Sequence, residues 1–243
     1  MADARAAGLL LALLASCAAP PSPAASGPGA DPARGRLVHT SEYQPREIEG
    51  WRVLVNRRLL DGRGAAALKL LETKLQDVVR AVPLLAVVEL RKVPIWLGVD
   101  DGHAPGAEYH PSREWLAANG YNPDKAKGVE IGSAANFVKW SNEQPSMLLH
   151  ELAHAYHDRV LGFDHAGIRE AYAEAKSRGL YDPVLRWNGR RERAYAMKDE
   201  KEYFAEGSEA YFGTNDFYPF VRAELKEHDP RLFRVLEEAW RPQ

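Results

Sequence analysis

Hydrophobic and polar positions in the first half of the chain are arranged in short stretches that are typical of β-strands. In the stretch EGWRVLVN, Trp51, Val53 and Val55 alternate with other positions, as expected of a strand with one buried face. Apolar side chains at helical spacing, ending at Pro83, predict one helix at residues 66–82. Strands are predicted at residues 49–56, 84–90, 93–99 and, as a bent strand, 129–140.

Apolar positions in the second half of the chain follow the helical period instead. Helices are predicted at residues 145–161, 166–179, 198–213 and 229–240. A Gly- and Pro-rich loop at residues 100–128 separates the two halves and contains a short predicted helix at residues 112–118. Because strands mostly precede helices, the sequence predicts an α+β fold with a small mixed sheet and a helical C-terminal lobe.

The predicted helix at residues 145–161 carries three histidines in an otherwise apolar segment. His150, His154 and His157 form one row beside Glu151. Two other rows are apolar: Leu149, Ala153, Tyr156 and Val160, and Leu148, Leu152 and Ala155. A helix that is apolar on two sides is deeply packed, so we expect the histidine row to line an internal cleft.

The segment HELAH therefore places the pattern H-E-x-x-H on a buried helix. His150 and His154 lie one turn apart and can both reach one tetrahedral Zn²⁺ ion. Glu151 is rotated away from the metal and is suited to act as a general base. His157 lies about 10 Å along the axis from His150, so we expect it to line the cleft or to support a ligand.

A hydrolytic zinc site needs a third protein ligand. Val160 occupies the position six residues after His154, which excludes a third histidine at that spacing. Two glutamates on later predicted helices remain as candidates, Glu174 and Glu202.

Glu202 also has structural interpretations. It can complete a capping box with Asp199, or belong to a solvated row with Glu206 and Glu209. Gly207 argues against both, because a glycine inside a helix costs about 1 kcal/mol relative to alanine. We expect another backbone to approach there, as when this helix crosses the histidine helix.

HELAH followed by EYFAE resembles the gluzincin metallopeptidases, and especially the catalytic domain of anthrax lethal factor and its relatives. The similarity covers residues 137–220. It implies a zincin-like fold in which His150, His154 and Glu202 bind zinc and Tyr195, seven residues before Glu202, assists the transition state. Spacing from His154 favours Glu174, which sits where the thermolysin-like gluzincins place their ligand. Local sequence favours Glu202, since Glu206 follows it at helical spacing and is suited to orient a ligating imidazole.

The predicted function is zinc-dependent hydrolysis of peptide bonds in a peptide or protein substrate. The strand ending in NFVKW is expected to pair with the substrate backbone, as the edge strand does in the family resembled. One alternative is an envelope-anchored, zinc-containing binding or cell-wall-associated module with little peptidase activity, against which the intact Glu151 argues. Another keeps the zinc chemistry but cleaves a peptidoglycan cross-link.

The N-terminal residues predict export and anchoring. An apolar run at residues 6–19 is too short to span a bilayer and suits a secretory signal. The segment LASC, ending at Cys17, resembles the bacterial lipobox, which predicts a signal peptide at residues 1–16 and lipidation of Cys17 on the cell envelope. The alternative is an ordinary signal peptide cleaved near Ala19 or Ala25.

The remainder of the chain is predicted to be a tether and one catalytic domain. Residues 17–36, rich in Pro, Ala and Gly, predict a flexible tether, and residues 37–243 a single domain acting as a monomer. The net charge is −2, and no basic stripe indicates binding to nucleic acid. Contact with a membrane is expected only through the lipid anchor.

Overall fold

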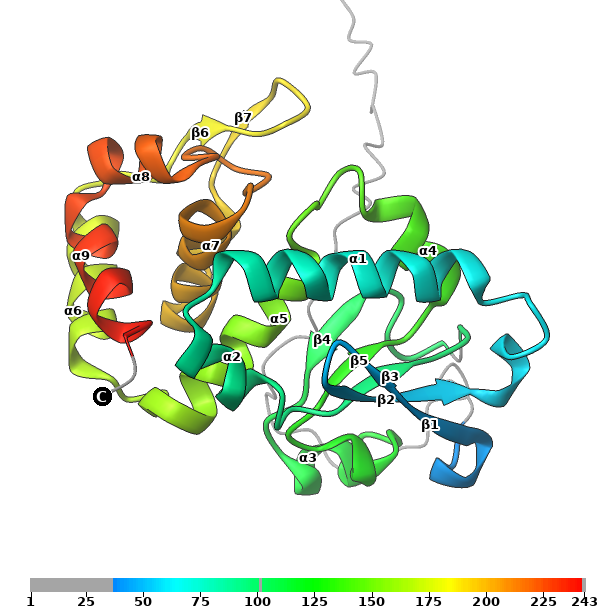
Figure 1. Cartoon of the computed structure of the whole chain (residues 1–243). Coiled ribbons are helices and arrows are strands. Elements are labelled where there is room, and N and C mark those ends of the chain that lie inside the picture. The colour runs from blue at the N-terminus through cyan, green and yellow to red at the C-terminus, as the bar shows by residue number, and fades with distance from the viewer. Residues whose placement is uncertain (1–36, 101, 242–243) are drawn as a thin grey trace, which may run out of the picture.

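The computed structural model describes residues 37–100 and 102–241 (Figure 1). The predicted signal peptide at residues 1–16, the lipidation site Cys17 and the tether at residues 17–36 lie outside the described residues. Within the described part of the chain, no helix combines the length and the apolar character needed to cross a membrane.

A five-stranded mixed sheet forms the first half of the described chain. Its strands are β1 (Tyr43–Ile48), β2 (Trp51–Asn56), β3 (Ile95–Leu97), β4 (Ala107–Tyr109) and β5 (Val129–Ile131), in the order β1-β2-β3-β5-β4. β2, β3 and β5 are parallel, whereas β1 and β4 run antiparallel to their neighbours. β4 is therefore an antiparallel strand at one edge of the sheet.

Helices cover one face of this sheet and bury its apolar side chains. They are α1 (Ala65–Ala81), α2 (Leu84–Leu90), α4 (Ala134–Trp140) and α5 (Met147–Tyr156). A smaller apolar group on the opposite face contains Val38, Tyr43, Leu54 and Trp96.

The short helix α3 (Arg113–Ala118) begins after Ser112, whose side chain accepts a hydrogen bond from the Trp115 backbone N–H. Single turns of 3-10 helix complete this half: η1 (Thr40–Glu42), η2 (Arg57–Leu59) and η3 (Pro123–Lys125).

The second half is mostly helical and packs on the other side of α5 (Figure 1). It contains α6 (Ala166–Ser177), α7 (Glu200–Phe212), α8 (Arg222–His228) and α9 (Pro230–Ala239), with the hairpin β6 (Val184–Leu185) and β7 (Arg191–Glu192) and the turn η5 (Tyr195–Met197). The Trp240 ring stacks on the Tyr156 ring of α5, with their centroids 4.2 Å apart. It also lies nearly parallel to the Phe204 ring of α7, with their centroids 5.8 Å apart. These rings join α5, α7 and the C-terminal end in one core, and the architecture confirms the predicted α+β class.

Two predicted strands are wrong. Residues 84–90 form helix α2, which buries Ala86, Val87 and Leu90 but leaves Leu84 72% exposed. An apolar run without polar alternation fits a buried strand or a helix equally well, and only the packing separates the two. Residues 129–140 divide into β5 and helix α4, because the Ser133 side chain accepts a hydrogen bond from Asn136 N–H and starts a helix.

Among the strands and α-helices of the described residues, five have no counterpart in the sequence prediction. They are β1, β4, β6, β7 and α8, of which β4 lies inside the segment predicted to be a loop. Gly207 does mark a close approach, but to α9: a Cβ atom there would lie 2.7 Å from Leu232 Cδ2. The expected crossing with the histidine helix at this position is wrong.

The histidine helix changes its period near its end. α5 is followed by a π-helical turn, η4 (His157–Leu161), which ends at Gly162 with φ of 81°. The change shifts the register of the last residues, and Val160, expected on an apolar face, is 40% exposed. His157 is fully buried between Phe163 and Phe204, and neither of its ring nitrogens has a hydrogen-bond partner.

Burial of His157 makes stability depend on pH. Desolvation lowers the pKa of His157 to about 3, so the folded protein keeps this ring neutral while the unfolded chain protonates it near pH 6.5. Stability is therefore lost as pH falls below about 6.5, at a rate of about 1.4 kcal/mol per pH unit. Replacing His157 with Leu should flatten this part of the stability curve.

Urea denaturation of the metal-free protein between pH 4 and 7 measures the effect. The exposed His39 provides the control, and His39→Gln should keep the slope of the parent protein. An unchanged slope in His157→Leu would contradict the account.

Candidate metal centre

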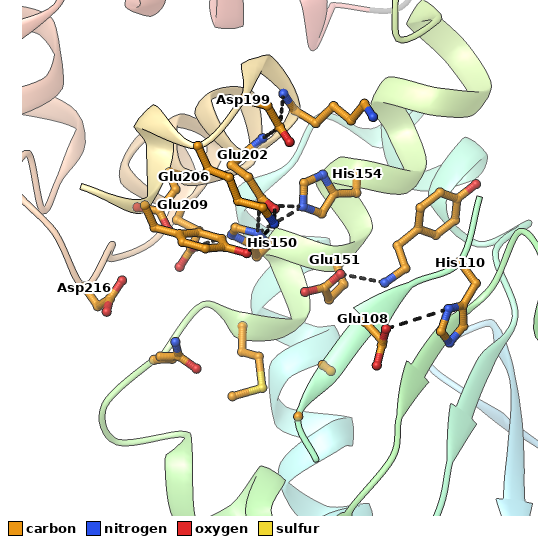
Figure 2. A pocket seen from close by; sticks show the side chains of 18 of the residues that line it. Glu108, His110, His150, Glu151, His154, Asp199, Glu202, Glu206, Glu209 and Asp216 are labelled. Carbon is orange, nitrogen blue, oxygen red and sulfur yellow. Dashed lines mark hydrogen bonds and ion pairs between the residues drawn. The ribbon is translucent and has the colours of Figure 1, made fainter. Parts of the chain in front are cut away.

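Helix α5 presents His150, Glu151 and His154 to the boundary between the two halves of the molecule. Leu148, Leu152 and Ala155 are buried on its opposite side, which fixes the rotation of the helix about its axis. The polar residues consequently point into a cavity of about 580 Å³ beside the edge strand β4 (Figure 2).

Helix α7 brings Glu202 to the same place. Asp199 caps this helix, and its Oδ1 accepts hydrogen bonds from the backbone N–H groups of Lys201 and Glu202, both at 3.0 Å. The Glu202 carboxylate turns toward the histidines (Figure 2). It is 7% exposed, so the interpretation as a solvated acidic residue is wrong.

Three ligand-type atoms converge at nearly equal distances. His150 Nε2, His154 Nε2 and Glu202 Oε2 lie 3.1 Å from one another in every pairing. Ligand atoms about 2.0–2.2 Å from a tetrahedral zinc ion stand about 3.3–3.6 Å apart. The observed separations are slightly shorter, so a small outward shift of the side chains would accommodate one metal ion. The donor set, two imidazoles and a carboxylate, is also one that zinc favours.

The orientation of His150 strengthens the case for a cation. Its Nδ1 lies 2.6 Å from Glu209 Oε1, and donation of the Nδ1 proton to that carboxylate leaves a lone pair on Nε2. Burial would raise the pKa of Glu202, but the imidazoles of His154 and His150 lower it, so its carboxylate is ionised. Burial lowers the pKa of His150, but Glu202 and Glu209 raise it well above its ordinary value. The site therefore favours a positive charge, which a metal cation would supply.

The partner of His150 is a correction to the sequence analysis. Glu206 was expected to orient a ligating imidazole, but Glu209 makes that contact. Glu206 lies one turn earlier on α7; its Oε2 is buried without a hydrogen-bond partner, and burial and the charge of Glu209 raise its pKa. Glu202, Glu206 and Glu209 share one helix face, so spacing alone could not decide between the last two.

Glu151 is held from the opposite side of the cavity. Its Oε2 accepts a hydrogen bond of 2.7 Å from the backbone N–H of Tyr109 in β4. Burial raises the pKa of Glu151 above its ordinary value, which makes the carboxylate a better proton acceptor. The same strand carries Glu108, whose pKa burial raises to about 7.

Tyr195 lies in η5, directly before α7, and lines the same cavity. Its hydroxyl oxygen is 2.9 Å from Lys198 Nζ, which is also 2.9 Å from Glu202 Oε1. Burial and the negative charge of Glu202 raise the pKa of Tyr195, so its hydroxyl keeps its proton. Lys198 was not predicted as a site residue from the sequence; it precedes the N-cap residue Asp199, so helical spacing does not relate it to Glu202.

Two other candidates lie away from these atoms. Glu174 is on the outer face of α6, where it pairs with Arg178 at 3.2 Å and also with Arg231. His157 is enclosed in the aromatic core and does not line the cavity, contrary to one of the two expectations for it.

No protein-family model and no curated protein matches the sequence. Among solved structures, the chain is similar to the PRO-PRO endopeptidase PPEP-2 from Paenibacillus alvei, with 20% sequence identity and a TM-score of 0.41. The similarity covers 79% of this chain and 99% of that chain. A likeness of this degree carries no conclusion about activity, and the lethal factor-like character expected from the two motifs stays a prediction.

Glu202 and Glu174 can be distinguished by their effect on bound metal. Glu202→Ala should lose most of the bound zinc, because it removes one of three convergent ligand atoms. Glu174→Ala should keep about one equivalent of zinc, since it only breaks an ion pair at the surface. Metal analysis of both purified variants by mass spectrometry makes the comparison, and the reverse pattern would transfer the ligand role to Glu174.

Proposed function

We propose that this chain is a zinc-dependent metallopeptidase of the gluzincin type. The observation that carries the proposal is the mutual 3.1 Å separation of His150 Nε2, His154 Nε2 and Glu202 Oε2. A base, Glu151, and a hydroxyl donor, Tyr195, line the same cavity. Ligands, base and donor together form the set of groups that amide hydrolysis requires.

A bound zinc ion would lower the pKa of a water molecule and polarise the scissile carbonyl. Glu151 takes a proton from the attacking water molecule while the oxygen of that water adds to the carbonyl carbon. The carbon–nitrogen bond then breaks, and Glu151 delivers the proton to the leaving amine. The Tyr109 N–H holds Glu151 in place for both transfers.

Tyr195 donates a hydrogen bond to the oxygen that becomes negatively charged when water adds. Its raised pKa keeps the proton available for this donation. Because Tyr195 and Glu151 lie on different segments, Glu151 can transfer the proton of the water while Tyr195 stabilises the negative charge on the carbonyl oxygen.

The edge strand β4 is the segment suited to bind an extended substrate. Gly106 and His110 bond to the segment that contains β5, and in an antiparallel ladder the bonding residues alternate. The backbone N–H and C=O of Ala107, at an intervening position, therefore point away from β5. A peptide can add there as a further strand. The expectation that NFVKW plays this role is wrong, since residues 134–140 form helix α4.

The geometry favours a peptidase over a module with zinc as a purely structural element. A structural zinc site uses four protein ligands, whereas three converge here and Glu151 is held beside them by a separate hydrogen bond. Whether the amide belongs to a protein or to a peptidoglycan cross-link is a question for substrate screening.

If Glu151 is the general base and not a zinc ligand, one variant should keep its zinc content but lose catalytic activity. Glu151→Gln should keep about one equivalent of zinc but lose on the order of 10²-fold or more in activity. The assay incubates the protein with a peptide library, with and without a zinc chelator, and identifies cleavage sites by mass spectrometry. Glu170→Gln on the exposed face of α6 is the control and should behave as the parent. Undiminished, chelator-sensitive cleavage by Glu151→Gln would reject the mechanism.

We further propose that the enzyme acts at the bacterial cell envelope, anchored through a lipid on Cys17. The motif LASC and the Pro- and Ala-rich segment after it support this location. Cys17→Ala should move the protein from membrane to soluble fractions upon expression with its full leader. Ser16→Ala, which retains the cysteine, serves as the control. Retention of Cys17→Ala on membranes at the level of the parent would refute the anchor.

A further inference from the structure

Lys198 contacts two groups of the proposed active site at once. It lies between η5 and α7, and its Nζ is 2.9 Å from Glu202 Oε1 and 2.9 Å from the Tyr195 hydroxyl oxygen. The ammonium group also lies over the Tyr195 ring, 4.9 Å from its centroid. One cation therefore links the segment that carries Tyr195 to the helix that carries Glu202.

A cation at this point is unfavourable for metal binding. The Glu202 side chain is 9% exposed and that of Lys198 is 38% exposed, so solvent screens part of the positive charge but the pair itself reaches into the buried site. The contact also withdraws negative charge from a metal ligand. We therefore expect Lys198 to lower zinc affinity and to have a compensating role elsewhere.

The two contacts have specific chemical consequences. With Oε1 engaged by Lys198, Glu202 presents Oε2 alone to the histidines. An ammonium group only donates hydrogen bonds, so the Tyr195 oxygen accepts from Lys198 and its own proton is left for donation. Lys198 thus bears on which carboxylate oxygen faces the metal and, together with Glu202, on how the phenol is oriented.

We propose that Lys198 is a positioning residue, which restricts Glu202 to one ligand oxygen and directs the Tyr195 hydroxyl proton into the cavity. This inference rests on the proposed peptidase function. It implies that Lys198 weakens zinc binding but increases turnover. A residue that only supports the fold would not have these two opposite effects.

Lys198→Met removes the charge and keeps most of the length of the side chain. Its zinc dissociation constant, measured by chelator competition on the metal-free protein, should fall by about threefold or more because the repulsion is gone. Its kcat for the best peptide from the library should drop by about tenfold or more, with KM within about threefold of the parent. Lys198→Arg keeps a cationic donor and should recover part of kcat.

A double-variant cycle tests whether Lys198 acts through Tyr195. Tyr195→Phe should lower kcat by about 10²-fold, the effect of losing one donor to a developing oxyanion. Adding Lys198→Met to Tyr195→Phe should then cost less than about threefold, because the hydroxyl that Lys198 positions is already absent. Lys176→Met is the matched control, since Lys176 Nζ contacts the Tyr172 hydroxyl at 3.4 Å on an exposed part of α6.

The outcomes separate this inference from the proposed function. Weaker or unchanged zinc binding in Lys198→Met, an unchanged kcat, or additive losses in the double variant would each overturn the positioning role while the parent remains an active peptidase. A parent protein that binds zinc but cleaves no peptide would overturn the proposed function instead. Zinc affinity would still report whether Lys198 opposes the metal.

Discussion

Helices α5 and α7, which lie more than forty residues apart in the sequence, must meet so that their ligand-type atoms converge, and much of the structure serves this requirement. α5 supplies two imidazole nitrogens and α7 supplies one carboxylate oxygen, all 3.1 Å apart. The three atoms belong to side chains from two helices, so the packing around both helices has to hold them in place. The stacked rings of Tyr156, Trp240 and Phe204 provide that packing on the far side of α5 and α7.

The groups around the three atoms are each fixed by a different part of the backbone. Glu209, two turns along α7, orients His150, and the edge strand β4 holds Glu151 through the N–H of Tyr109. Lys198, in the junction before α7, holds the second oxygen of Glu202. A site assembled from independent supports keeps its geometry when one part moves, which is what preorganised catalysis requires.

The path of the chain into the edge strand β4 also depends on a close contact between two backbone segments. A Cβ atom on Gly132 would lie 1.8 Å from the Ala104 carbonyl oxygen, so only glycine allows the segment before β4 to pass this close to the end of β5. This contact brings β4 to the side of α5, where it can hold Glu151. The outward-facing backbone groups of Ala107 thereby come to line the cavity that contains the candidate metal ligands.

The sequence by itself determined the α+β class and the pairing of His150 with His154, because both follow from local periodicity: a spacing of four places two side chains on one helix face wherever the helix lies. Local periodicity could not separate a short apolar strand from a short helix, which is why residues 84–90 were assigned wrongly. The choice of Glu209 over Glu206 beside His150, and the place of Lys198, were decided by the tertiary structure. Helix spacing aligns Glu206 and Glu209 on one face of α7, and only the depth and angle at which α7 crosses α5 sets which of them reaches His150. Lys198 precedes the helix, so helical spacing does not place it.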